Sequence, residues 1–287
     1  MERVHYRNEV STAPSEAIWG EPVIAKACDD PAFGFHRFDD FLAFPNAGNN
    51  ISNTSHGDYM AWTSAAATIV AASEAGGVID FYTATDGQAA ALALAAPLLN
   101  MPGAAVGAAP TGKAFACEFR MKTDTLADTK HEIFAGLMNN TALSATVPIT
   151  NGAGGDVLAS QPMIGFHRTE ADGDVITTRY YDAAQADVKL AAITASTSTN
   201  NKGETIPAFV VDTFIKLGML YLPNKLNANG DNLSFFADGF LLNEGLTNAE
   251  IEAFSALDAA YLRLVFAYRA AASTGGTPSL DWLKLKP

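Results

Sequence analysis

The stretch Phe209-Val-Val-Asp-Thr-Phe-Ile-Lys-Leu-Gly-Met-Leu-Tyr-Leu-Pro223 is followed by a second apolar run, Leu233-Ser-Phe-Phe-Ala-Asp-Gly-Phe-Leu-Leu242. The segment Asn227-Ala-Asn-Gly-Asp-Asn232 separates the two runs. Turns between antiparallel strands select Asn, Asp and Gly, because these residues tolerate positive φ. The two runs therefore predict a β-hairpin.

Similar short apolar runs recur along the chain between turn signals. This spacing is typical of an all-β sandwich and differs from that of alternating strands and helices. The run 89–100 is also compatible with a helix, because Ala and Leu dominate it, but Pro97 and the neighbouring runs favour strand. The predicted strands are 59–72, 78–83, 89–100, 113–123, 132–138, 163–169, 175–182, 188–193, 208–222, 233–242, 262–271 and 280–285.

One short helix of about three turns is predicted over residues 246–257. Thr247 and Glu250 have the spacing of a capping box, and Ile251, Phe254 and Leu257 follow at helical intervals. The polar segment 194–203 is expected to be a surface loop.

The first 45 residues mix short apolar pieces with Pro and Gly. They predict either an irregular arm lying on another surface or a lead-in strand of the sandwich. The division expected is therefore 1–45 as this segment and 46–287 as one jelly-roll β-sandwich domain.

The charge balance narrows the classes of ligand. The chain has 18 Lys+Arg against 31 Asp+Glu, a formal net charge of −13. Binding to nucleic acid or to an anionic membrane needs clustered cations, so neither is an expected partner. The N-terminus is charged and lacks the apolar core of a secretion signal, which predicts synthesis and folding in a cytosol.

Charges are also sparse, at 17% of residues. Two explanations remain open at this point. The chain is either a large sheet protein rich in small residues, or a protein whose surface is covered by other subunits.

The search for catalytic motifs finds no supported site. Residues 107–114 have phosphate-loop spacing until Ala114 replaces the Ser or Thr that would bind magnesium, and a strand pattern follows. His131-Glu132 begins like a zinc-protease helix, but Ala135 stands where the second ligand belongs. Cys117 alternates with apolar residues and is predicted to be a buried thiol, and Cys28 lacks metal-site spacing from it.

Acidic and amide side chains give two weaker candidates. Glu170, Asp172 and Asp174 approach the alternating carboxylates of a glycoside hydrolase, yet Gly173 interrupts them in a predicted turn. Asn227, Asn229 and Asp231 offer oxygen ligands for calcium, although turns select the same residues for conformational reasons. We therefore expect no enzyme activity, no cofactor and no metal.

The C-terminal part resembles the end of a concanavalin-like lectin/glucanase jelly roll. The resemblance extends over roughly residues 110–287. It rests on the runs 209–223, 229–240 with its Phe-Ala-Asp-Gly pattern, 262–269 and Leu280-Asp-Trp-Leu-Lys-Leu285, and the upstream runs 116–121 and 133–138 match the fold's earlier strands. It implies an antiparallel jelly-roll β-sandwich.

Within that group, a chain of this length without catalytic acids or a secretion signal resembles capsid decoration (cement) or head-fibre proteins of tailed bacteriophages. That resemblance implies a structural protein on the exterior of a virion, assembled in the host cytoplasm. It would bind the major capsid protein and itself, as a homo-oligomer such as a trimer. The alternative is a carbohydrate- or receptor-binding domain in which Trp62, Tyr180 and Tyr181 stack on sugar, unless these rings pack in the sandwich.

Overall fold

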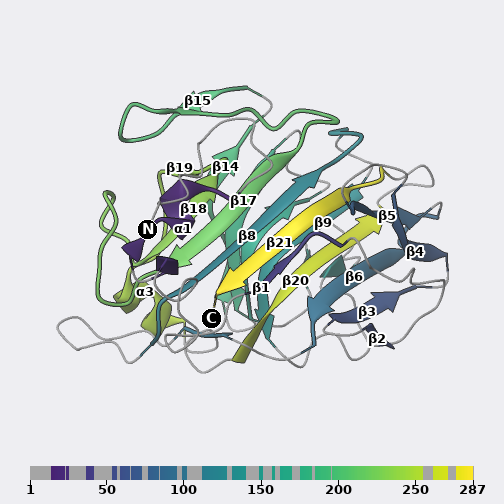
Figure 1. Ribbon diagram of the computed structural model, residues 1–287, viewed down its shortest axis with the longest axis horizontal. Helices are drawn as coiled ribbons and strands as arrows, with labels where there is room; N and C mark the ends of the chain where they lie inside the picture. Colours follow the sequence, from purple (N-terminus) through teal and green to yellow (C-terminus); the bar gives the residue numbers. More distant parts are fainter. Residues whose placement is uncertain are drawn as a thin grey trace, which may run out of the picture.

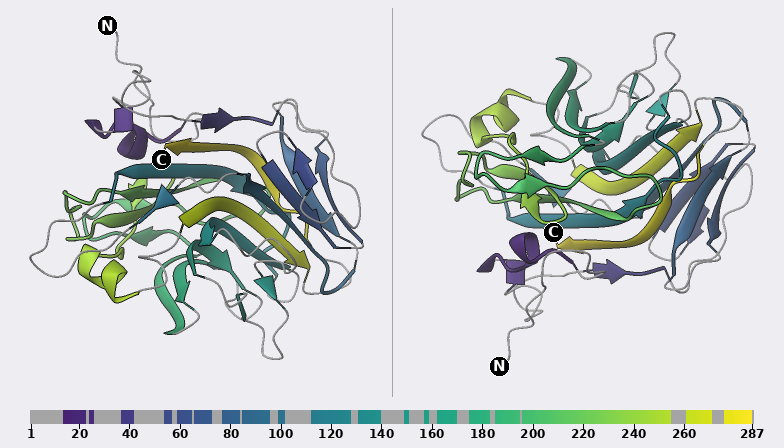
Figure 2. Two further views of the ribbon diagram at one scale, coloured as in Figure 1. Left: turned by 90° about the horizontal axis from the view of Figure 1, so that it is seen from below. Right: turned by 90° about the horizontal axis from the view of Figure 1, so that it is seen from above.

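The computed structural model shows two antiparallel β-sheets packed face to face (Figures 1 and 2). It describes residues 14–22, 24–25, 37–41, 54–56, 59–64, 66–72, 77–83, 85–95, 99–101, 112–127, 131–139, 149–150, 157–158, 162–169, 175–182, 185–194, 196–254, 261–270 and 276–286. The predicted antiparallel jelly-roll sandwich is confirmed.

Sheet A has the strand order β19-β18-β17-β8-β21-β5-β4, and β1 pairs with the remaining edge of β21. Its strands are β1 (Arg37–Asp39), β4 (Ala67–Ala71), β5 (Ile79–Thr83), β8 (Phe115–Lys122), β17 (Ile215–Tyr221), β18 (Leu233–Ala237), β19 (Phe240–Leu241) and β21 (Ser279–Lys286).

Sheet B has the order β14-β13-β12-β9-β20-β6-β3-β2, with β7 pairing to β20. Its strands are β2 (Thr54–His56), β3 (Tyr59–Thr63), β6 (Ala89–Leu94), β7 (Leu99–Asn100), β9 (His131–Asn139), β12 (Met163–Arg168), β13 (Ile176–Asp182), β14 (Gln185–Ile193) and β20 (Tyr261–Ala270). Two small hairpins complete the described strands: β10 (Ile149–Thr150) with β11 (Val157–Leu158), and β15 (Ser198–Thr199) with β16 (Thr205–Ile206).

The main core fills the space between the sheets. Alternate residues of β8, including Phe115, Cys117 and Phe119, point into it and are at most 1% exposed. Rings from the two sheets meet there: the centroids of Phe81 and Phe266 are 4.7 Å apart. Burying an aromatic side chain of this size contributes about 2–3 kcal/mol, so many such contacts hold the sheets together. The Cys117 thiol is buried as predicted, and burial raises its pKa above the usual range.

Several predicted runs are divided in the structure. The run 59–72 forms two strands, β3 and β4, which belong to different sheets. The run 89–100 is divided into β6 and β7, and the run 208–222 is a strand only from Ile215. The predicted loop 194–203 contains β15 and leads into β16. Breaks of this kind depend on where the chain must change sheets, and the local apolar pattern does not mark them.

The predicted helix is confirmed in a shorter form, α3 (Asn248–Ala253). Its capping box is complete, because Thr247 and Glu250 exchange side-chain-to-backbone hydrogen bonds. Residues 255–257 of the predicted helix lie outside the described residues. In the part of the chain that the structure describes, no helix is long and apolar enough to cross a membrane.

A second helix, α1 (Glu16–Trp19), was not predicted from the sequence. It packs on the outer side of sheet A (Figure 2), where Ile18 and Trp19 join an apolar cluster with Leu220 and Phe236. Ile18 occupies a notch that a glycine leaves, because a Cβ atom at Gly218 would stand 2.2 Å from Ile18 Cδ1. The described N-terminal residues therefore pack against their own sandwich.

The carboxylate of Glu118 fixes this N-terminal segment to sheet A. Its Oε2 accepts hydrogen bonds from the Ser15 backbone N–H at 3.0 Å and from Trp19 Nε1 at 2.8 Å, and the Ser15 hydroxyl donates to Oε1. Burial raises the pKa of the Glu118 carboxyl, and these hydrogen bonds oppose that shift. Lys284 Nζ lies 4.1 Å from the centroid of the Trp19 ring on the same face.

Replacing this carboxylate is expected to release the segment. Glu118→Met removes the acceptor for three donors, so stability should fall by about 1–3 kcal/mol. Amide hydrogen exchange of residues 15–19 should accelerate at least tenfold. Lys225→Ala is the matched control, because it breaks only the exposed 2.8 Å ion pair with Glu21 on the same segment. Unchanged exchange in Glu118→Met would show that Glu118 does not anchor the segment.

Candidate ligand-binding face

The outer face of sheet B is defined by the strand register. Residues opposite each other in paired strands point to the same face, so the pairings arrange the outward side chains in rows. The middle row runs from β13 to β3 as Arg179, Gly165, Gly136, Val265, Ala93 and Met60. The next row runs as Thr177, His167, Phe134, Ala267, Ala91 and Trp62. On the other side lie Tyr181, Met163, Met138 and Arg263.

Two glycines at the centre of this face lie directly opposite each other. A Cβ atom at Gly136 would stand 2.7 Å from Gly165 Cα and 2.9 Å from the Phe134 ring. A side chain at either position would therefore collide with backbone that cannot easily move. The glycines leave room for the Phe134 ring, which packs over Gly136 beside the small residues Ala91 and Ala93.

Apolar residues on this face form a cluster separate from the main core. It consists of Ala91, Ala93, Phe134, Met138, Met163, Val265 and Ala267, with the half-buried Tyr181 packed against them. These seven residues are at most 1% exposed, so the cluster itself is buried, and the exposed Tyr261 marks its accessible border.

Three arginines supply polar groups on the same face. Arg269 lies opposite Glu132, and its Nη1 is 3.3 Å from Glu132 Oε1. Arg179 donates from Nε to the Thr177 hydroxyl at 2.7 Å. The third arginine, Arg263, places its Nη1 2.8 Å from the thioether sulfur of Met60. Tyr261 lies two residues before Arg263 on β20 and is 65% exposed.

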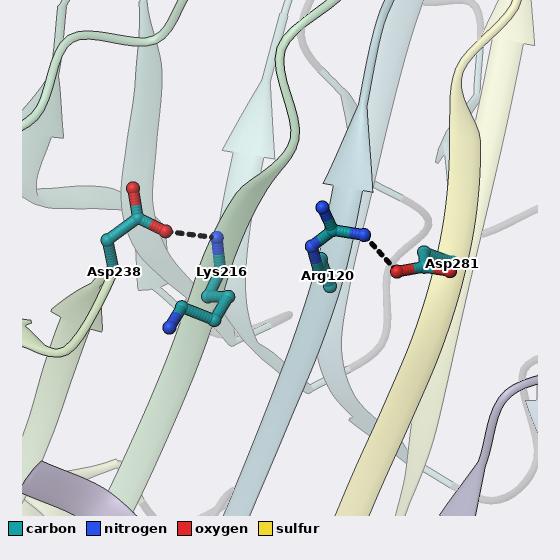
Figure 3. A network of polar contacts seen from close by, with 4 residues as sticks. All are labelled: Arg120, Lys216, Asp238 and Asp281. Carbon is teal, nitrogen blue, oxygen red and sulfur yellow. Dashed lines mark hydrogen bonds and ion pairs between the residues drawn. The ribbon is translucent and has the colours of Figure 1, made fainter. Parts of the chain in front are cut away.

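The outer face of sheet A carries a different polar network (Figure 3). Arg120 pairs with Asp281 on the neighbouring strand, and the Lys216 backbone N–H donates to Asp238 Oδ1 at 2.8 Å. Arg120 also lies over the Phe214 ring, 4.1 Å from its centroid. Burial raises the pKa of the Asp238 carboxyl, while Lys216 and Arg120 oppose that shift. Since these groups bond to each other, the network stabilises sheet A and offers a ligand little.

The three aromatic residues proposed from sequence for sugar stacking have different positions. Tyr180 is 3% exposed and packs in the core against Phe254, with ring centroids 3.9 Å apart, so for this residue the alternative of packing in the sandwich holds. Trp62 and Tyr181 are partly exposed and lie on the outer face of sheet B, on the two sides of the small-residue centre.

The residues of the apparent zinc motif point to opposite sides of β9. His131 is buried toward the core, with Nε2 3.0 Å from the Thr123 hydroxyl, whereas Glu132 pairs with Arg269 on the outer face. Burial lowers the pKa of His131 to about 3, and the charge of Arg168 acts in the same direction. This histidine is therefore neutral at physiological pH.

The calcium candidates form an ordered turn. Asn227 Oδ1 accepts hydrogen bonds from the backbone N–H groups of Asn229 at 2.7 Å and Asp231 at 2.9 Å. Asn229 Nδ2 donates to the carbonyls of Leu242 and Asn243. These amides shape the turn through hydrogen bonds, as the conformational interpretation predicted.

The remaining sequence candidates cannot be placed. Glu170, Asp172, Asp174, Cys28 and residues 107–111 lie outside the described residues. Within the described ranges, no group of three or more His, Cys, Asp or Glu side chains could hold a metal ion.

Sequence reasoning did not find Arg263 or its surroundings. The signal that was present is the alternation in β20, where Tyr261, Arg263 and Arg269 share the parity of Val265 and Ala267. Two charged residues on an otherwise apolar strand indicate a polar function for that face. Their neighbours, however, depend on pairing with strands far away in the sequence.

In sequence, the chain matches no protein-family model and no curated protein. Solved structures that are similar in fold include the carbohydrate recognition domain of Emp46p in its potassium-bound form, with 11% identity, a TM-score of 0.49, and coverage of 87% of this chain and 98% of that one. A laminarinase catalytic domain from Thermotoga petrophila RKU-1 has 11% identity and a TM-score of 0.46, covering 79% and 81%. The VIP36 exoplasmic/lumenal domain has 10% identity and a TM-score of 0.40, covering 80% and 83%. Lectin and glucanase domains thus both occur among the structural neighbours.

The buried His131 predicts a specific dependence of stability on pH. Its pKa is about 3 in the folded protein against an ordinary value of 6.5, so the unfolded chain binds the additional proton between these values. Stability should fall as pH drops from 6.5 toward 3, by up to about 1.4 kcal/mol per pH unit from this group. Urea denaturation of wild type and His131→Gln between pH 7 and 4.5 measures this contribution. The variant should start less stable but lose stability less steeply, and parallel curves for the two proteins would contradict the assignment.

Proposed function

We propose that the protein is a lectin-like carbohydrate-binding protein that uses the outer face of sheet B and performs no reaction on its ligand. The observation that carries the proposal is Tyr261, a 65% exposed aromatic ring at the border of a face made of small and apolar residues. Tyrosine suits this role because its ring offers an apolar surface and its hydroxyl remains able to hydrogen-bond.

A second tyrosine extends the same face. Tyr181 lies on β13, three strands from β20, which places the two tyrosines roughly 16 Å apart at ordinary strand spacing. Met163 and Met138 lie in the row that leads from Tyr181 to Arg263, next to Tyr261 on β20. A ligand that contacts both rings must be extended, which favours an oligosaccharide over a single sugar.

Binding is favoured over hydrolysis by the state of the carboxylate on this face. A glycoside hydrolase uses two carboxyl groups on either side of the scissile bond. Among the described outward side chains of sheet B, Glu132 is the one carboxylate, and its Oε1 lies 3.3 Å from Nη1 of the 4% exposed side chain of Arg269. Such a group is poorly suited to act as a general acid.

The capsid-decoration role stays a prediction from the sequence, together with the major capsid protein and self-association as partners and the virion as location. In that role, the N-terminal segment would be an arm lying on another surface. The described part of that arm instead packs on sheet A of the same chain through Ile18, Trp19 and Glu118.

Tyr261→Ala tests the carbohydrate proposal. The full chain is first screened on a glycan array, and the oligosaccharide bound best is then titrated by calorimetry. The variant should bind roughly three- to tenfold more weakly, because it loses one aromatic contact worth about 0.5–1.5 kcal/mol.

Tyr82→Ala is the matched control, since Tyr82 is a 46% exposed tyrosine on β5 of the other sheet. Its affinity should equal that of wild type. The proposal fails if wild type binds no glycan at high micromolar protein, or if both variants bind as wild type does.

A further inference from the structure

Arg263 is a buried cation in apolar surroundings. It is 5% exposed, lies opposite Met138 on β9, and has Val265 as the next outward residue on its own strand. Its Nη1 contacts the Met60 thioether at 2.8 Å, and its buried Nε has no hydrogen-bond partner. A thioether is a weak acceptor, whereas a guanidinium carries five N–H donors.

Other arginines on the two outer faces have a carboxylate or hydroxyl partner. Arg269 pairs with Glu132 and Arg120 pairs with Asp281, while Arg179 donates to a hydroxyl. Desolvation lowers the pKa of the Arg263 guanidinium. A buried guanidinium without a carboxylate partner destabilises the folded protein. We therefore looked for a functional reason for its position.

The neighbouring tyrosine indicates what kind of anion would fit. Tyr261 and Arg263 are alternate residues on β20, so they point to the same face about 7 Å apart. A ligand that meets both must carry an apolar ring face and an anionic group within one sugar unit. Because Tyr261 is exposed, this end of the strand gives access from solvent.

The charge of the protein favours a carboxylate over a more highly charged anion. A phosphate dianion gains most from several cations, whereas a carboxylate matches one guanidinium through two parallel hydrogen bonds. The net charge of −13 also disfavours ligands with a high density of negative charge.

We propose that Arg263 binds the carboxylate of an acidic saccharide, such as a uronic acid unit, while Tyr261 stacks on the same sugar ring. The inference rests on the proposed carbohydrate function and specifies its ligand class. Arg263 then contributes selectivity for acidic over neutral glycans, and the cost of burying it is recovered when the ligand binds.

A matched pair of probes tests the carboxylate directly. A neutral oligosaccharide that ends in a single glucuronic acid unit and the methyl ester of that unit have the same sugar backbone and differ in one charge. Calorimetry with the full-length chain should give at least tenfold tighter binding of the acid form. Arg263→Met should remove this preference, Arg263→Lys should retain part of it, and an oligosaccharide sulfate should bind more weakly than the uronate.

Thermal unfolding supplies a second measurement that does not depend on affinity. Arg263→Met replaces the uncompensated cation by a side chain like its neighbours, so the ligand-free variant should melt at or above the wild-type temperature. Arg269→Met, the control, leaves Glu132 without its arginine and should melt lower. The acid probe should raise the melting temperature of wild type more than its ester does, whereas the two probes should raise that of Arg263→Met equally.

The outcomes separate the two proposals. Equal binding of acid and ester by both wild type and Arg263→Met overturns the role of Arg263 and leaves carbohydrate binding intact. Tighter binding of the sulfate than of the uronate overturns the carboxylate assignment. Absence of binding to every acidic and neutral glycan overturns both proposals.

Discussion

Both sheets depend on the last two strands of the chain, which are inserted at their centres. β21 lies between β8 and β5 in sheet A, and β20 lies between β9 and β6 in sheet B, as the two yellow strands show in Figure 1. Each central pair joins segments more than 120 residues apart, for example Phe119 with Leu283 and Phe134 with Ala267. Such pairings cost loop entropy before they contribute stability, so neither sheet is complete until the C-terminal residues are in place.

The same insertion determines the two outer faces. On sheet A, β21 brings Lys284 beside Glu118, and together they hold Trp19 of the N-terminal segment. This face is therefore covered by the chain itself. On sheet B, β20 brings Arg263 onto a face built from small and apolar residues and Tyr261 to the border of that face. The C-terminal strands therefore help to hold the N-terminal segment on sheet A and supply polar groups to the outer face of sheet B.

The sequence predicts the sandwich well because strand alternation and turn residues are local signals. In the structure, Asn227 hydrogen-bonds within the predicted turn, and Thr247 and Glu250 form the predicted capping box. The break between β3 and β4 was missed, since Ser64 and Ala66 carry no Gly or Pro signal. The candidate site was missed for a different reason. It is defined by rows across strands that span over 200 residues of sequence, and no local pattern encodes that register.

The outer face of sheet B differs in charge from the chain as a whole. Among the described side chains of sheet B, three arginines and one carboxylate point outward, in a chain that carries 31 Asp+Glu and only 18 Lys+Arg. A local excess of positive charge on an otherwise acidic protein attracts a small anion at short range, while the net charge repels extended polyanions. The low dielectric around a buried guanidinium strengthens that attraction further. Under the proposed function, this arrangement would make affinity depend on one well-placed charge and on the ring that stacks beside it.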